Sequence, residues 1–203
     1  IPYMKITRNG GFFKTARSGR SVVLLDPHSK KQDAEAFRYL RTSVQYSSAE
    51  HPPQLILITS CFPQEGKSTV SSNLAIFFAE RGQKTIIVDA DLKRPNVHKV
   101  FEVPRMPGVS DVLTGQCELD SAIIQSKVPN LHILPAGLAT PSPITLLESQ
   151  AMADLLASLR SRYTTIILDS APAHGMADAL VLSTRVDGIM LVVKQGSTLT
   201  EVL

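Results

Sequence analysis

The residues best suited to chemistry lie in one loop between a strand-like run and a helix-like run. The loop ends in Gly66-Lys67-Ser68, and in such a loop the backbone N–H groups and the N-terminus of the following helix point at a bound anion. Lys67 would add a positive charge beside the phosphates, and the Ser68 hydroxyl is a suitable ligand for magnesium. We therefore predict a nucleotide-phosphate site, although Cys61 stands where the general GxxxxGK[ST] pattern has its first glycine. The residues expected to contact the cofactor are Pro63, Gln64, Glu65, Gly66, Lys67, Ser68 and Thr69.

Three aspartates follow two other apolar runs of the sequence. Asp89 and Asp91 come after the run 85–88, and Asp169 comes after the run 165–168. The strands of a parallel sheet deliver such residues to the ligand-binding edge, and a magnesium–nucleotide site needs carboxylate oxygens beside the phosphates. The alternative is that each aspartate only caps the turn or helix after its strand. Three carboxylates at two strand ends, together with the phosphate loop, favour the nucleotide site.

The elements that must position these side chains alternate between strand and helix. The strand-like runs are continuously apolar, which is typical of strands buried on both faces by helices. We therefore predict an α/β fold with a doubly wound, mostly parallel sheet of the P-loop NTPase type and helices on both faces. Strands are predicted at 55–59, 85–89, 131–134, 165–169 and 188–193, and helices at 33–47, 68–81, 144–160 and 176–184.

Composition is consistent with one domain in a reducing setting. The 203 residues contain 43% hydrophobic side chains, which is enough for one sizeable core. No apolar run reaches the roughly 18 residues needed to cross a bilayer. Cys61 and Cys117 show no metal-binding or redox spacing, which favours a cytoplasmic location.

Basic side chains are concentrated at the start of the chain. Residues 1–31 carry seven Lys or Arg residues against Asp26 alone, whereas the remainder carries fourteen basic and seventeen acidic groups. We interpret 1–31 as a basic, juxtamembrane-like arm and 32–203 as one domain. Such an arm suits an anionic membrane surface, where each Lys or Arg contributes about 1 kcal/mol. Its aromatic residues form no stacking platform, so we expect no nucleic-acid partner; a solvated arm without a partner is the other alternative.

The predicted helix at 33–47 carries a charged stripe beside its apolar face. Glu35, Arg38 and Arg41 form this stripe at i,i+3 spacing. One interpretation is an exposed face stabilised by pairing within the helix. The other is an oligomer interface, in which Glu35 of one protomer meets the arginines of its neighbour.

Taken together, these motifs resemble those of the bacterial tyrosine kinases (BY-kinases) that are attached to polysaccharide co-polymerases. The resemblance covers nearly the whole chain. Pro-Gln-Glu-Gly-Lys-Ser at 63–68 matches the family's PxxGK[ST] loop, and Val-Asp-Ala-Asp-Leu-Lys-Arg-Pro at 88–95 resembles its second, acidic motif. The runs 108–115 and 167–172 are similar to two further family segments, and 35–41 fits the ExxRxxR helix through which kinase domains of the family form rings.

This resemblance implies a role for each site residue, with ATP and Mg²⁺ as cofactors. Lys67 would hold the β- and γ-phosphates and Ser68 would be a metal ligand. Asp91 and Asp169 would hold the metal, largely through water. Asp89 would accept the proton of the attacking tyrosine hydroxyl. The implied reaction is phosphoryl transfer from ATP to tyrosine.

The resemblance also implies partners and a location. The expected assembly is a ring homo-oligomer at the cytoplasmic face of the bacterial inner membrane, in contact with a transmembrane polysaccharide co-polymerase domain, fused or separate. There the kinase would regulate capsule or exopolysaccharide synthesis and export. The expected acceptor is a C-terminal tyrosine tail of a neighbouring protomer. This sequence ends at Leu203 with its tyrosines scattered, so we expect that tail and the C-terminal end of the domain to be missing from it.

Two alternatives belong to other functional classes. One is a regulatory ATPase switch of the partitioning and division-site class. Those proteins carry a lysine early in the phosphate loop, where this chain has Phe62, so the sequence favours the kinase. The other is a catalytically silent scaffold that binds nucleotide, and it would use the same residues.

Overall fold

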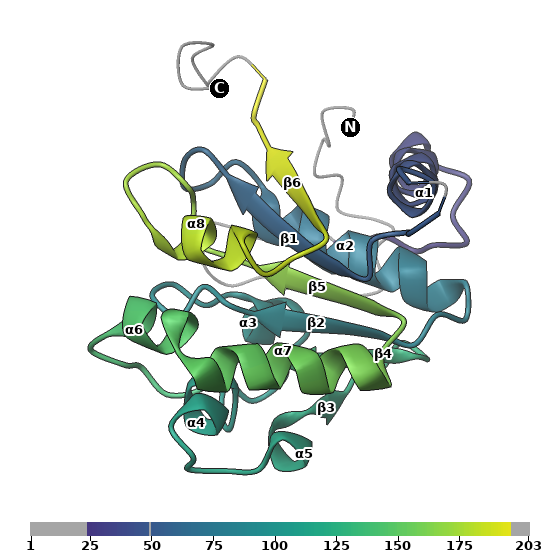
Figure 1. The fold of residues 1–203 in the computed structure, drawn as a ribbon. Helices are drawn as coiled ribbons and strands as arrows, with labels where there is room; N and C mark the ends of the chain where they lie inside the picture. Colours follow the sequence, from purple (N-terminus) through teal and green to yellow (C-terminus); the bar gives the residue numbers. More distant parts are fainter. Residues whose placement is uncertain (1–23, 49, 196–203) are drawn as a thin grey trace.

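Figure 1 shows the computed structural model of the chain, which describes residues 24–48 and 50–195. A six-stranded sheet with the order β3-β4-β2-β5-β1-β6 forms its middle layer. All neighbouring strands are parallel except β3, which is antiparallel to β4. The predicted α/β fold with a mostly parallel sheet is therefore confirmed. The strands are β1 (Leu55–Ser60), β2 (Thr85–Asp89), β3 (Ile124–Gln125), β4 (Leu131–Leu134), β5 (Thr165–Asp169) and β6 (Gly188–Val192).

Helices pack on both faces of the sheet, and each face has its own apolar core. Along β1, Ile56 and Ile58 belong to one core and Leu55 and Leu57 to the other, because successive strand residues point to opposite faces. The first face is covered by α1 (Gln32–Gln45), α2 (Lys67–Glu80) and α3 (Val97–Val100). The second is covered by α4 (Val109–Leu113), α5 (Leu119–Ala122), α6 (Pro143–Glu148), α7 (Gln150–Arg162) and α8 (Asp178–Ser183).

The strand register brings the ends of three strands to one edge. Asp89 at the end of β2 lies opposite Asp169 at the end of β5, and Asp169 lies opposite Ile58 of β1. Because β1 runs directly into the Gly-Lys-Ser loop, the loop and both carboxylate-bearing strand ends share the carboxyl edge of the sheet. This is the edge at which open α/β sheets bind ligands.

The prediction of a single helix at 144–160 is wrong. The structure has two helices there, α6 and α7, because Ser149 between them is extended with ψ 160°. The Ser149 hydroxyl accepts a hydrogen bond from the Met152 N–H at 3.3 Å and so caps α7, while Arg185 donates to the carbonyls of Glu148 and Ser149. The short elements α3, α4, α5 and β3 were not predicted, because two to five residues give no periodic signal.

The described end of the predicted basic arm is packed against the domain. Residues 1–23 of that arm lie outside the described residues, but Leu24 and Leu25 are buried in the first core. The Leu25 N–H donates to Asn73 Oδ1 of α2 at 2.7 Å. None of the helices within 24–48 and 50–195 combines the length and apolarity that crossing a membrane requires.

Helix α1 contributes Phe37 to the first core, where its ring is fully buried and packs on Phe77 of α2 with 5.7 Å between ring centroids. We expect Phe37→Ala to lower the free energy of unfolding by about 3–5 kcal/mol, because it removes a large buried ring. Tyr39→Ala on the exposed side of the same helix is the matched control. Urea denaturation of both variants checks this, and equal effects would contradict the packing of α1.

Candidate active site

The phosphate loop is shaped by backbone conformations that only a few residues adopt readily. Gly66, with φ 98°, lies in the left-handed region directly before α2, and Gln64 also has a positive φ of 71°. The loop is braced internally, since the Phe62 N–H donates to Glu65 Oε2 at 2.8 Å. No side chain caps the start of α2. The N–H groups of its first turn are therefore available to an anion, as a phosphate site requires.

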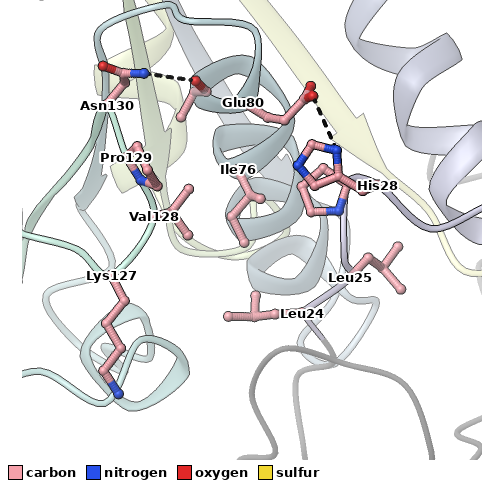
Figure 2. Close-up of a pocket in the computed structure, with 11 residues that line it drawn as sticks. Leu24, Leu25, His28, Ile76, Glu80, Lys127, Val128, Pro129 and Asn130 are labelled. Carbon is pink, nitrogen blue, oxygen red and sulfur yellow. Dashed lines mark hydrogen bonds and ion pairs between the residues drawn. The ribbon is translucent and has the colours of Figure 1, made fainter.

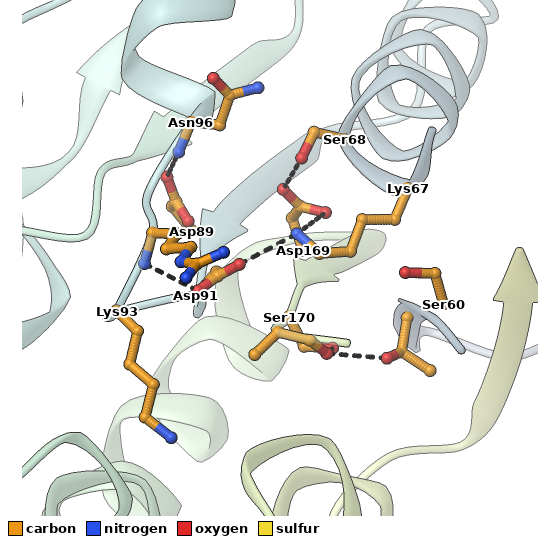
Figure 3. Close-up of polar contacts among 12 residues, drawn as sticks. Ser60, Lys67, Ser68, Asp89, Asp91, Lys93, Asn96, Asp169 and Ser170 are labelled. Atoms are coloured by element: carbon orange, nitrogen blue, oxygen red, sulfur yellow. Dashed lines mark hydrogen bonds and ion pairs between the residues drawn. The ribbon is translucent and has the colours of Figure 1, made fainter. Parts of the chain in front are cut away.

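Lys67 and Ser68 of α2 meet the two carboxylate-bearing strand ends (Figure 3). Lys67 Nζ lies 3.1 Å from Asp91 Oδ2 and 3.7 Å from Asp169 Oδ1. The Ser68 hydroxyl donates to Asp169 Oδ2 at 2.7 Å. Asp89 is also buried at this edge, opposite Asp169 in the register of β2 and β5. The structure thus brings Lys67 and Ser68 together with all three aspartates predicted for the site.

The carboxyl group of Asp89 has a strongly perturbed pKa. Burial raises the pKa of its carboxyl group to about 8, and the negative charge of Asp169 adds to the effect. Its Oδ2 accepts the N–H groups of Asn96 at 3.0 Å and Val97 at 2.9 Å, whereas its Oδ1 is buried without a hydrogen-bond partner. Burial therefore favours the protonated form of the Asp89 carboxyl in the nucleotide-free protein.

Lys67 and Asp169 have shifted pKa values as well. Burial opposes the charged form of Lys67, but the charges of Asp169 and Asp91 outweigh burial and raise its pKa. Burial raises the pKa of Asp169, although Lys67 and Ser68 act against that shift. Perturbed groups of this kind, gathered at one edge of a sheet, are typical of a functional site.

The donor set at this edge fits a magnesium ion bound together with a nucleotide. Asp89 Oδ1 and Asp169 Oδ1 are both buried without a hydrogen-bond partner, and both are hard oxygen donors. Within 24–48 and 50–195, no three His, Cys, Asp or Glu side chains are grouped closely enough to hold a metal ion by themselves. Magnesium usually takes only one or two carboxylates and completes its shell with water and phosphate oxygens. The Ser68 hydroxyl, Asp91 and Asp169 are suitable members of such a shell.

Two contacts around the site could not be found from sequence. Lys93, within the predicted second motif, forms an ion pair with buried Asp178 of α8, with 2.8 Å between Lys93 Nζ and Asp178 Oδ2. The His174 ring packs against Phe62 of the phosphate loop with 4.8 Å between centroids. Both contacts join the phosphate loop or the second motif to the segment after β5. Neither has a sequence signal, because the partners lie 85 and 112 residues apart in the chain.

The predicted interface residues lie on α1, away from the carboxylates. Arg38 pairs with Glu35 within the helix, and its guanidinium also donates to the carbonyls of Pro27 at 2.5 Å and Ser29 at 2.6 Å. Arg41 is half-buried beside the end of α2. Arg38 therefore anchors the segment that leads into α1, and the interface itself stays a prediction.

A cavity of about 460 Å³ lies at the opposite end of α2 (Figure 2). Leu24, Leu25 and Ile76 contribute apolar walls, and His28 Nδ1 lies 3.9 Å from Glu80 Oε1 at its rim. Lys67 and Glu80 are the first and last residues of α2, so the helix separates this cavity from the phosphate loop. The cavity is therefore distinct from the predicted nucleotide site.

A strand, a Gly-Lys-Ser loop, a helix and carboxylates at neighbouring strand ends define a P-loop nucleotide-binding domain. A family model described as an AAA domain matches residues 64–198. The tyrosine-protein kinase YwqD of Bacillus subtilis is 33% identical over 195 residues, which cover 96% of this chain and 80% of YwqD. The chain therefore belongs to the bacterial tyrosine-protein kinases, as its motifs predicted, and is an enzyme of the phosphoryl-transfer class.

Solved structures agree with this assignment. The kinase domain of the Escherichia coli tyrosine kinase ETK matches with a TM-score of 0.80 and 33% identity over 83% of this chain and 66% of that chain. The septum site-determining protein MinD of Pyrococcus horikoshii matches with a TM-score of 0.59 and 29% identity over 68% of this chain and 57% of that chain. The tyrosine kinase is thus the nearer of these two structures.

The raised pKa of Asp89 makes the stability of the nucleotide-free protein depend on pH. Its carboxyl group has a pKa of about 8 when folded and about 3.9 in an unfolded chain. Between these values the folded state holds one more proton, so the free energy of unfolding falls as pH rises. Asp89→Asn keeps an acceptor oxygen for Asn96 and Val97. We expect the free energy of unfolding of Asp89→Asn to exceed that of wild type at pH 8 by on the order of a few kcal/mol. This difference should shrink toward pH 5.

Urea denaturation across this pH range, without magnesium or nucleotide, measures the difference. Asp187→Asn is the matched control, because the hydrogen bond from Arg160 lowers the pKa of Asp187 and keeps it ionised throughout. The difference in unfolding free energy between Asp187→Asn and wild type should therefore not change with pH. If the difference between Asp89→Asn and wild type did not change with pH either, this would contradict the raised pKa of Asp89.

Proposed function

We propose that this domain transfers the γ-phosphoryl group of Mg·ATP to a tyrosine hydroxyl of a neighbouring protomer. The observation that carries this proposal is the position of Lys67 and Ser68, at the end of the phosphate loop, against Asp91 and Asp169. Phosphoryl transfer requires mainly positioning and neutralisation of charge, and this cluster supplies groups for both. The proposal agrees with membership of the tyrosine-protein kinases.

Each residue of the cluster has a distinct task in this proposal. The N–H groups at the start of α2 and the Lys67 ammonium hold the β- and γ-phosphates, which requires Lys67 to release Asp91 or Asp169. Ser68 would be a magnesium ligand, and Asp91 and Asp169 would hold the metal largely through water. The metal, when bound, neutralises the charge that develops on the phosphate oxygens. The tyrosine oxygen forms a bond to the γ-phosphorus as the bond to the β,γ-bridging oxygen breaks, which leaves ADP.

Asp89 accepts the phenolic proton in this scheme. Its pKa of about 8 would keep it protonated at neutral pH and unable to act as a base. A divalent cation bound beside it lowers the pKa of a carboxyl group and favours the ionised form. Asp89 would therefore become a competent base only when metal and nucleotide are present. This links proton acceptance to occupancy of the site.

The proposed setting is a ring homo-oligomer at the cytoplasmic face of the bacterial inner membrane. In it the kinase would phosphorylate a C-terminal tyrosine tail of the neighbouring protomer and so regulate capsule or exopolysaccharide synthesis and export, together with a transmembrane co-polymerase domain. The family resemblance and the seven basic residues of 1–31 support this setting.

We expect Lys67→Ala to lower tyrosine phosphorylation by on the order of 10²–10³-fold or more, because it removes the cation beside the transferring phosphoryl group.

Asp89→Asn should reduce turnover much more than nucleotide binding, since the asparagine can hold the same N–H groups but cannot accept a proton.

The measurement follows the γ-phosphate of labelled ATP in the natural full-length protein with Mg²⁺, and titration with a fluorescent ATP analogue gives the affinities. Label on tyrosine in Lys67→Ala at the wild-type rate would contradict the proposal. Label released only as free phosphate by wild type would favour the regulatory ATPase, and binding without turnover would favour the scaffold.

A further inference from the structure

The tyrosines of the described chain differ sharply in their access to solvent. Tyr163 is buried. Its ring packs against His132 with 5.4 Å between ring centroids, and Lys84 Nζ lies 5.2 Å from the centroid of the Tyr163 ring. Tyr39 and Tyr46 are 77% and 73% exposed. Tyr3 lies outside the described residues. For a tyrosine kinase, an exposed tyrosine on its own surface is a candidate acceptor, so Tyr39 and Tyr46 have to be distinguished.

The backbone separates these two residues. Tyr39 lies in the middle of α1, where helical hydrogen bonds fix the chain on both sides. Tyr46 is the first residue after the helix, with φ −108° and ψ 16°, and the described residues 47, 48 and 50–54 that follow it belong to no helix or strand. Helix ends and connections open locally at low cost, and an acceptor must leave its own surface to enter another active site. This favours Tyr46 over Tyr39.

The surroundings of Tyr46 suit a phosphorylated side chain. The pKa of the Arg41 guanidinium is lowered, mainly by burial and then by the positive charge of Arg81, with a smaller contribution from Arg38. Glu80 and Tyr46 act in the opposite direction and raise it. The Arg41 side chain is half-buried. Its Nε is buried without a hydrogen-bond partner. The positive charge of the Arg41 guanidinium, whose pKa responds to Tyr46, would favour a phosphate on that side chain.

Tyr46 is too far from its own phosphate loop for transfer within one copy. Val44 and Ser47, on either side of Tyr46 in the chain, line a small pocket together with Pro53, just before β1, whereas the phosphate loop follows the other end of β1. The six residues of β1 span about 20 Å at about 3.3 Å per residue. This distance exceeds the reach of a tyrosine side chain, so any transfer to Tyr46 has to come from another molecule.

We propose that Tyr46 is a phosphoacceptor of this kinase and receives its phosphoryl group from the active site of a second copy of the chain. The inference rests on the proposed function. Tyr46 Oη forms a bond to the γ-phosphorus of ATP, the bond to the β,γ-bridging oxygen breaks, and the phenolic proton passes to the Asp89 carboxylate of the second copy. The products are ADP and phosphotyrosine at position 46.

The first test locates phosphate on the full-length protein after incubation with Mg·ATP. Cleavage after Glu35 and Glu50 yields the peptide 36–50, which contains both Tyr39 and Tyr46, and fragmentation in the mass spectrometer separates them. We expect roughly tenfold or more phosphate at Tyr46 than at Tyr39. Tyr46→Phe should remove phosphotyrosine from this peptide, and Tyr39→Phe should leave it. Phosphate at Tyr39 instead, or phosphotyrosine only outside 36–50, would overturn this inference alone. Phosphotyrosine nowhere in the protein would overturn the proposed function as well.

The second test asks whether transfer occurs between copies. Lys67→Ala, which lacks the phosphate-binding lysine but keeps Tyr46, is mixed with Tyr46→Phe, which keeps Lys67 but lacks the acceptor. Phosphate on Tyr46 of the mixture has to come from a second molecule, and we expect it to appear only when both variants are present. If wild type were phosphorylated at Tyr46 but the mixture of the two variants were not, transfer between copies would be overturned. Circular dichroism checks that Lys67→Ala folds. If it does not, Asp91→Asn replaces it as a catalytically inactive variant that keeps Tyr46 as acceptor.

Discussion

The active edge of this protein depends on holding three buried carboxylates close to one lysine. Asp89, Asp91 and Asp169 are almost completely shielded from water, and a buried carboxylate is costly unless it is paired, hydrogen-bonded or protonated. The protein uses all three means: Lys67 pairs with Asp91 and Asp169, two backbone N–H groups bind Asp89, and the raised pKa of Asp89 keeps a proton on it. The nucleotide-free site is thus prepared for additional positive charge.

The rest of the fold keeps these groups in register. The pairing of β1, β2 and β5 places Asp89 opposite Asp169 and both beside the strand that enters the phosphate loop. Two apolar cores, one on each face, fix the sheet between its helices. Because the loop turns into α2 through the left-handed Gly66, Lys67 and Ser68 emerge directly over the carboxylates. The carboxylates are thus held in place before a phosphate chain binds, whereas Lys67 has to exchange a carboxylate partner for the phosphates.

Much of this arrangement could be predicted from sequence, because its signals are local. Continuous apolar runs gave the parallel strands, and a polar residue at a strand end marks the ligand edge of such a sheet. The spacing of Gly66, Lys67 and Ser68 indicated the phosphate loop without any knowledge of the fold. The grouping of Asp89 and Asp169 then followed, since the carboxyl ends of parallel strands meet at one edge.

Other features depend on contacts between distant residues and had no sequence signal. The break at Ser149 interrupts an otherwise helical pattern, and Arg185, far along the chain, supports it. The ion pair of Lys93 with Asp178 and the burial of Leu24 in the first core depend on tertiary packing. Local patterns predict which elements form, whereas tertiary contacts decide where they break and what covers them.

The most direct test of the charge-compensated site is the number of protons released when Mg·ADP binds at pH 7. Calorimetry in buffers of different ionisation enthalpy measures this number. If Asp89 holds a proton until the metal arrives, wild type should release about one proton and Asp89→Asn close to none. Equal proton release from both proteins would contradict the account, because Asp89 would then carry no proton for the metal to displace.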